Sequence, residues 1–230
     1  MVRIAVGIPM HATSITTLGL LALGLTAFAP TGYAAERESG ITVTPRLSLG
    51  LVAGISQTDD ELETILDPGD EHTTNGGSNI EIPVEIAFRG EGPWYFILTP
   101  SLAISGNTND FKGANGESAE ESFAAVGVRV YTGVGYQFND YCSIDLTPFL
   151  GVAAVAGKYE ESGADSVDSD GTITQFGATL GGYVTWKPGF QLGARLGFIS
   201  GTGSVEYDGG DSYDIDQSGA LLAVDLGWQF

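Results

Sequence analysis

Along most of the chain, hydrophobic and polar side chains alternate with a period of two, the pattern of a β-strand whose two faces meet different surroundings. In the run that begins at Ile41, the odd positions are apolar and their even neighbours include Thr42 and Arg46. Eight such runs follow one another, and none has a charge on its apolar face. They cover residues 41–53, 80–88, 94–104, 124–138, 144–152, 176–186, 190–198 and 220–230. The pattern predicts an all-β chain of about eight antiparallel strands.

The connections between the runs are alternately short and long. The short links are 90–93, 139–141 and 187–189, and the long ones are about 54–79, 106–121, 157–172 and 201–218. An up-and-down meander with short turns at one end and long loops at the other is typical of transmembrane β-barrels, whose tilted strands need roughly 9–11 residues to span. We therefore expect one closed transmembrane barrel over residues 41–230.

A period of two does not by itself say which face is inside, because a soluble lipocalin-like barrel alternates in the same way. Charges and many glycines on the opposite face favour a narrow lumen, with lipid on the apolar face. Large aromatic residues also gather near the short turns, as they do at a bilayer interface. They are Phe88, Trp94, Tyr136, Phe138, Trp186, Phe190, Trp228 and Phe230. Pro45, Pro100 and Pro148 oppose strand pairing, although β-bulges could absorb them.

The first 35 residues have the composition of a cleavable signal peptide. Arg3 gives a positive start, an apolar run follows at 18–28, and small residues precede position 35. The apolar run is shorter than the roughly 20 residues of a spanning helix, which indicates a secretory signal rather than an anchor. We divide the chain into a signal peptide at 1–35, a short N-terminal extension at 36–40 and the barrel at 41–230.

The last residues, LLAVDLGWQF, resemble the C-terminal signal of outer-membrane barrel proteins, a terminal Phe after alternating apolar and aromatic residues. The matching positions are Leu222, Val224, Leu226, Trp228 and Phe230. The barrel region as a whole resembles the small eight-stranded families typified by the OmpA membrane domain, OmpX and the opacity-type adhesins, in pattern rather than by a family motif. The resemblance implies a monomer in the outer membrane of a Gram-negative bacterium, in contact with lipid and lipopolysaccharide. It also implies that the barrel assembly machinery and periplasmic chaperones recognise Leu226, Trp228 and Phe230.

The net charge of −20 argues against binding to nucleic acid, whose phosphates such a chain repels. The single cysteine, Cys142, excludes an internal disulfide and a thiolate metal cluster. The four long connections hold 21 acidic residues and only two lysines, Lys112 and Lys158. These acidic loops are either a solvated, repulsive surface or a place where divalent cations or a basic partner bind.

The polar face of the strands carries four arginines and four acidic residues. We predict a luminal charge cluster, because desolvated charges persist only in pairs. Its members are Arg46, Glu85, Arg129, Asp145, Arg195 and Asp225, with Glu81 and Arg89 as the other inward charges. The last strand must neighbour the first and the seventh, so Asp225 is expected between Arg46 and Arg195. Such a layer is either a structural plug or a narrow, gated ion path.

Beyond this layer the inward residues are small and apolar, which fits either a hydrophobic pocket open toward the loops or tight packing. These residues are Val52, Ala103, Ala125, Ala153, Val155, Ile199, Leu221 and Ala223.

Enzymatic chemistry finds little support. Barrel enzymes need a base near a nucleophile or paired carboxylates, and the predicted mature chain has one histidine, His72, in an acidic loop. The segment DSVDSDGTIT hints at a calcium loop, but Gly177 occupies the position where an EF-hand needs a bidentate Glu. We predict no catalytic residue, metal site or cofactor. The favoured function is structural or a cell-surface interaction through the acidic loops. A narrow pore or small hydrophobic-ligand conduit is the alternative, and a lipid A-modifying enzyme is third.

Overall fold

The computed structural model describes residues 40–58, 71–113, 118–161, 166–207 and 210–230, so the predicted signal peptide lies outside the described residues. Nearly all of this part is β-strand. The strands are β1 (Gly40–Val52), β2 (Ile55–Gln57), β3 (Glu71–Thr74), β4 (Gly77–Arg89), β5 (Trp94–Lys112), β6 (Ser118–Gln137), β7 (Cys142–Glu161), β8 (Val167–Thr185), β9 (Phe190–Tyr207) and β10 (Ser212–Trp228). Among the described residues, no helix is long and apolar enough to cross a membrane.

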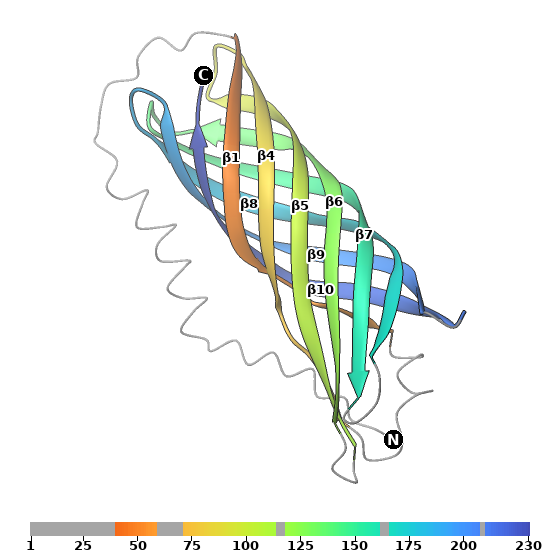
Figure 1. Ribbon diagram of the computed structural model, residues 1–230. Coiled ribbons are helices and arrows are strands. Elements are labelled where there is room, and N and C mark those ends of the chain that lie inside the picture. The colour runs from red at the N-terminus through yellow and green to blue at the C-terminus, as the bar shows by residue number, and fades with distance from the viewer. Residues whose placement is uncertain (1–39, 59–70, 114–117, 162–165, 208–209) are drawn as a thin grey trace.

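The eight long strands form a closed antiparallel ring in the order β1, β4, β5, β6, β7, β8, β9, β10, and β10 pairs back onto β1. The short strands extend this ring: β2 pairs with β10, and β3 pairs with β5. The short turns and the C-terminus lie at one end, and the β5–β6, β7–β8 and β9–β10 hairpins point to the other (Figure 1). The predicted up-and-down barrel is confirmed.

The apolar face of each strand points outward. Leu150 is 68 % exposed and Val128 is 55 % exposed, whereas inward polar residues such as Glu81 are fully buried. A soluble barrel would bury the apolar set instead, so the lipocalin-like alternative is wrong. We call the outward set the apolar belt. Its members include Leu47, Leu49, Leu51, Ile80, Ile82, Phe96, Leu102, Ile104, Val126, Val128, Val130, Leu150, Val152, Phe176, Leu180, Leu196, Phe198, Val224 and Leu226.

Aromatic side chains surround the end of the barrel that carries the short turns. Trp94 contacts Tyr136 with ring centroids 4.9 Å apart, and Trp186 stacks on Phe190 at 5.8 Å. All four side chains lie close to a short turn, and Trp94, Trp186 and Phe190 are exposed, as expected of an interfacial girdle.

The strands are longer than the apolar alternation predicted, and the long loops are correspondingly shorter. β5 and β6 remain paired as far as Lys112 and Ser118, where a loop was expected over 106–121. The predicted strand ended at residue 104 because the outward residues beyond it, such as Thr108 and Asp110, are polar. Backbone pairing nevertheless continues through them. The connections predicted at 157–172 and 201–218 shorten in the same way. We call the parts beyond the belt the distal hairpins: residues 107–112, 118–123, 157–161, 167–174, 200–207 and 212–218.

The prolines interrupt pairing without shifting the register, so they are accommodated without β-bulges in these described ladders. Pro45 pairs with Val84, and the same register resumes at Ser48 and Glu81 after a short gap. Pro100 and Pro148 lie in ladders whose register also continues unchanged. The missing proline donor therefore removes a local hydrogen bond and leaves the strand alignment intact.

Glycines leave room for large inward side chains to pack flat against the wall of a narrow lumen. A Cβ on Gly135 would lie 2.1 Å from Cζ of Tyr95, and one on Gly193 would lie 2.2 Å from Cδ1 of Tyr183. The two tyrosines thus lie directly over the neighbouring strand, which agrees with the narrow lumen predicted from the glycine-rich face.

Candidate functional site

The lumen within the belt is crossed by a buried ionic network centred on Glu81 of β4. Glu81 pairs with Arg129 of β6, and its Oε2 accepts a hydrogen bond from Arg195 Nη2 of β9 at 2.9 Å. The Tyr131 hydroxyl donates to both carboxylate oxygens, at 2.9 and 3.0 Å. At least two strands separate β9 from β4 and from β6 in either direction around the ring, so this cluster joins different walls of the barrel across the lumen.

Arg195 also joins Glu81 to Asp225 of β10. Its Nε donates to Asp225 Oδ2 at 2.9 Å, and its Nη2 donates to Ser48 Oγ at 2.7 Å. Tyr183 adds a longer hydrogen bond to Asp225, at 3.3 Å. Of the two arginines expected beside Asp225, the structure brings Arg195 into an ion pair with it.

Arg46 pairs with Glu85 instead. Its Nη2 donates to Glu85 Oε2 at 2.7 Å, its Nε donates to Gln191 Oε1 at 2.6 Å, and its guanidinium lies 4.1 Å from the Tyr183 ring centroid. Arg46, Glu85 and Tyr183 thus form a second group, nearer the short turns. Arg89 lies nearer still to that end, where it donates to Gln137 and stacks on Tyr95.

Asp145 differs from the other members of the predicted cluster. It is 3 % exposed, yet none of the ion pairs among the described residues includes it, and its Oδ1 has no hydrogen-bond partner. The structure therefore brings Arg129, Arg195 and Asp225 together through Glu81, pairs Arg46 with Glu85, and leaves Asp145 beside them without a salt bridge.

Glu81 was predicted to face inward, but it was not one of the six residues of the predicted charge cluster. Side-chain parity gives the face of a strand and not the height of a residue in the barrel, and the stagger of tilted strands brings Glu81 level with Arg129 and Arg195. The polar residues that complete the network were not predicted as site residues. They are Ser48, Asn79, Tyr131, Gln175, Tyr183, Gln191 and Gln217.

Amide side chains continue the network toward the distal end. Arg129 Nε donates to Gln175 Oε1 at 3.1 Å, and Gln175 Nε2 donates to Gln217 Oε1 at 2.7 Å. Gln217 in turn donates to the carbonyl of Ala53 at 2.5 Å. This chain links β6, β8, β10 and the β1–β2 connection across the lumen.

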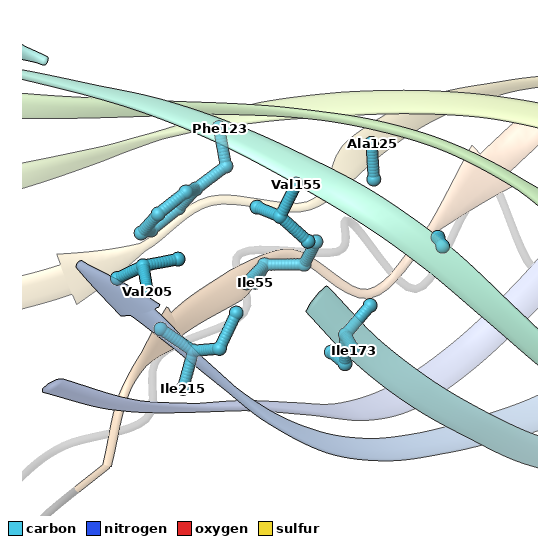
Figure 2. Packing of buried hydrophobic residues seen from close by; sticks show 8 residues of the cluster. Ile55, Phe123, Ala125, Val155, Ile173, Val205 and Ile215 are labelled. Atoms are coloured by element: carbon cyan, nitrogen blue, oxygen red, sulfur yellow. The ribbon is translucent and has the colours of Figure 1, made fainter. Parts of the chain in front are cut away.

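Apolar packing fills the lumen beyond the amides. Figure 2 shows Ile55 of β2 surrounded by Phe123, Val155, Val205 and Ile215, side chains from four further strands. The small apolar residues predicted to face inward are all buried. The larger ones were missed because Ile215 lies in the predicted loop 201–218 and Phe123 lies just before the predicted run that begins at residue 124. The packed cluster favours tight packing over a pocket.

A second polar layer lies in the distal hairpins, around Glu121 of β6. The Tyr207 hydroxyl donates to Glu121 Oε1 at 2.5 Å, Gln57 Nε2 donates to the same oxygen at 3.2 Å, and Asn109 Nδ2 donates to Oε2 at 3.2 Å. Glu121 was missed as a site residue because the sequence placed it in a loop.

The other residues considered for catalysis or metal binding do not come together in a site within the described residues. The His72 ring stacks on Phe111 with centroids 4.5 Å apart, and Cys142 is buried. From Val167 onward the calcium-like segment is part of the extended strand β8, with Asp168 and Asp170 exposed. No group of three or more His, Cys, Asp or Glu suited to a metal occurs in the described part of the chain. In the predicted assembly signal, Leu226 and Trp228 point outward and Phe230 is 76 % exposed.

No protein-family model and no curated protein matches the chain. Several solved structures are similar. They include Ail, the attachment invasion locus protein of Yersinia pestis, in complex with the heparin analogue sucrose octasulfate (13 % identity over 84 % of this chain and 100 % of that chain, TM-score 0.40). OprG from Pseudomonas aeruginosa shares 11 % identity over 86 % of this chain and 99 % of that chain, TM-score 0.40. The outer membrane protease OmpT from Escherichia coli shares 7 % identity over 88 % of this chain and 100 % of that chain, with a TM-score of 0.44. At these values no functional residue is carried over to this chain.

Proposed function

We propose that this chain is a closed, non-enzymatic barrel of the bacterial outer membrane that stabilises the membrane and presents its acidic distal hairpins to the exterior. The apolar belt supports the membrane setting, because it offers lipid a continuous charge-free surface. The observation that carries the closed-barrel proposal is the Glu81 network, which joins different walls of the lumen through two arginines.

Ion pairs of this kind resist permeation. Arg129 and Arg195 already have carboxylate partners, and Tyr131, Ser48 and Gln175 satisfy further donors and acceptors. An ion that crossed this layer would have to break buried pairs, and breaking one typically costs about 3–5 kcal/mol. The apolar cluster around Ile55 adds a second barrier above it.

Conductance in planar lipid bilayers tests the proposal. We expect the refolded barrel to give no steady channels, because the network and the apolar cluster both close the lumen. Steady ohmic current from the unmodified protein would replace this proposal with the narrow-pore alternative. Removal of the acyl chains of lipid A by the purified barrel would instead favour an enzyme.

The outward acidic residues of the distal hairpins support a surface role. Asp110, Glu120, Asp168 and Asp170 are all exposed there. We propose that divalent cations bridge these carboxylates to anionic lipopolysaccharide. Binding of the barrel to lipopolysaccharide should then require Ca²⁺ and should fall when the four are replaced by Asn or Gln. Equal binding with and without Ca²⁺ would refute the bridging role.

The C-terminal tail supports recognition by the assembly machinery and chaperones during insertion. Phe230 lies outward beyond the end of β10, where its backbone N–H donates to the Val43 carbonyl at 3.0 Å. Deleting Phe230 should leave export intact and reduce the folded, heat-modifiable barrel in the outer-membrane fraction. An unchanged amount in that fraction would argue against the recognition role.

A further inference from the structure

Glu121 is a buried carboxylate in a part of the molecule that water surrounds. Its side chain is 0 % exposed, although its neighbours Glu120 and Lys158 on the outer face are exposed. The surrounding outward residues are polar, so this layer stands beyond the apolar belt. Burial here is therefore imposed by the protein's own packing and not by lipid.

The partners of this carboxylate are neutral. Tyr207, Gln57 and Asn109 each donate one hydrogen bond to it, and none of the ion pairs among the described residues includes it. A buried carboxylate without a cation loses its hydration and gains only dipoles in return. The carboxylate is thus the costly form of Glu121 in this packing.

The same layer holds β2 in place. The Asn107 side chain binds Ile55 as a strand would, with Oδ1 accepting from the backbone N–H and Nδ2 donating to the carbonyl, both at 2.9 Å. Asn109 adds a further bond to that carbonyl at 3.0 Å. β2 is therefore paired with β10 on one side and clamped to β5 on the other, and Gln57 ties it to Glu121. In this position β2 inserts Ile55 into the apolar cluster (Figure 2).

We propose that Glu121 and Gln57 form a proton-dependent latch that holds β2 across the distal end of the lumen, closing when Glu121 gains a proton and loosening when it loses it. Gln57 Oε1 supports this assignment, because it is buried and has no hydrogen-bond partner in the part of the chain that the structure describes. Turning the Gln57 amide over places this oxygen toward Glu121, where a protonated carboxyl can donate to it. The turn also moves Nε2, which donates to Glu121 Oε1 at 3.2 Å and to the Tyr207 hydroxyl at 3.1 Å, so the gain on protonation is the removal of the buried charge.

The direction of the pH dependence follows from burial. Burial raises the pKa of the Glu121 carboxyl above its ordinary value, although hydrogen bonds from Tyr207, Asn109 and Gln57 lower it in part. When β2 is released, water solvates the carboxyl and its pKa returns toward about 4.3. The latched state therefore binds the proton more tightly. Its extra stability is fully present below the ordinary pKa and is lost as the pH rises through the raised one.

The other titratable groups around Glu121 are three tyrosines and one histidine. Tyr207 of β9 and Tyr159 of β7 face Glu121, and Tyr213 of β10 packs on Tyr207 with ring centroids 5.2 Å apart. Burial raises the pKa of the Tyr207 hydroxyl, so it stays protonated in the range of interest. His72 of β3 stacks on Phe111 beside this layer and is the group whose titration must be separated from that of Glu121.

Amide hydrogen exchange of the full barrel in lipid nanodiscs tests the latch. Protection factors of the Ile55 and Gln57 amides, corrected for intrinsic exchange at each pH, should be higher at pH 5 than at pH 8, by roughly tenfold for each unit by which the raised carboxyl pKa exceeds 5. Glu121→Gln should abolish this difference and keep β2 protected at both pH values. The controls Glu120→Gln, on the outer face, and His72→Gln should keep the wild-type difference.

Two results would overturn the latch. One is equal protection of β2 at pH 5 and pH 8 in the wild type, and the other is a pH difference that survives in Glu121→Gln and disappears in His72→Gln. If Glu121→Gln does not fold, the latch is tested in the wild type by following the ¹³C chemical shift of the Glu121 carboxyl as a function of pH. The midpoint of this titration gives the pKa of the carboxyl. A midpoint near about 4.3 contradicts the latch. A raised midpoint that rises further in Tyr207→Phe, which lacks a donor to the charged form, supports it.

Discussion

Glu81 and Glu121 are both completely buried, both point into the lumen, and both receive a hydrogen bond from a tyrosine. Their surroundings differ in one respect: Glu81 lies between Arg129 and Arg195, whereas the partners of Glu121 are neutral. Within the belt, water cannot reach the lumen from the side, and charges are retained as pairs. In the distal hairpins a single carboxylate is retained without a counter-ion, which makes it sensitive to pH. The same residue type is thus a fixed structural element at one height and a titrating one at another.

The largest expected effect comes from removing Glu81. Glu81→Gln leaves Arg129 and Arg195 short of an anion, and breaking such a buried pair costs about 3–5 kcal/mol of unfolding free energy. Glu121→Gln leaves no charge stranded and should change stability by at most about 1 kcal/mol at neutral pH. Urea unfolding of both variants in lipid vesicles checks the contrast. Similar losses for the two would show that the belt network is not held by charge pairing.

The outer face should show the same division between belt and hairpins. Val128→Arg introduces a charge on the lipid face of β6 and should cost about 2–4 kcal/mol near the bilayer midplane. Ser122→Arg on the same strand and the same face lies beyond the belt and should be tolerated. Folding yields and unfolding free energies in vesicles measure both. Equal tolerance of arginine at the two sites would remove the support for the lipid-facing belt.

A smaller effect is expected from the narrowness of the lumen. The Cβ of Gly193→Ala would displace the Tyr183 ring, which packs against Arg46 and donates to Asp225. Overpacking of this kind typically costs about 1–3 kcal/mol. Gly182→Ala is the matched control, because nothing lies within 4 Å of the Cβ it would add. Equal stability of the two variants would mean that the lumen has more room than the structure shows.

Much of this architecture could be predicted from the sequence. The period of two located all eight long strands and the charge-free face identified the side that meets lipid. The same alternation put Arg46, Arg195 and Asp225 on the inner wall, because side-chain direction depends only on parity along a strand. These features are local, and a single strand is enough to define them.

The features that could not be predicted depend on relations between strands. Which arginine meets which acid is set by the stagger of tilted strands, so Arg46 pairs with Glu85 and Arg195 with Asp225. The distal hairpins lack an apolar outer face, and their inner face mixes Phe123 and Ile215 with polar residues such as Glu121, so no regular alternation marked them as strands. Glu121 was consequently taken for a solvated acidic residue of a loop. The inward position of β2 could not be predicted, because three residues are too few to show an alternation of apolar and polar side chains.

The coupling between Arg195 and Asp225 tests most directly whether paired charges close the lumen. Arg195→Met, Asp225→Asn and the double variant form a cycle, with Arg89→Met and Asp225→Asn as a control pair, since Arg89 bonds to Thr42 and Gln137 near the short turns. Urea unfolding should show that the Arg195 and Asp225 double variant loses less stability than the sum of the single variants. The difference should fall within about 0.5–3 kcal/mol, and the control pair should be additive. Additive, small losses in the Arg195 cycle would show that water solvates both charges, and the closed lumen would have to be abandoned.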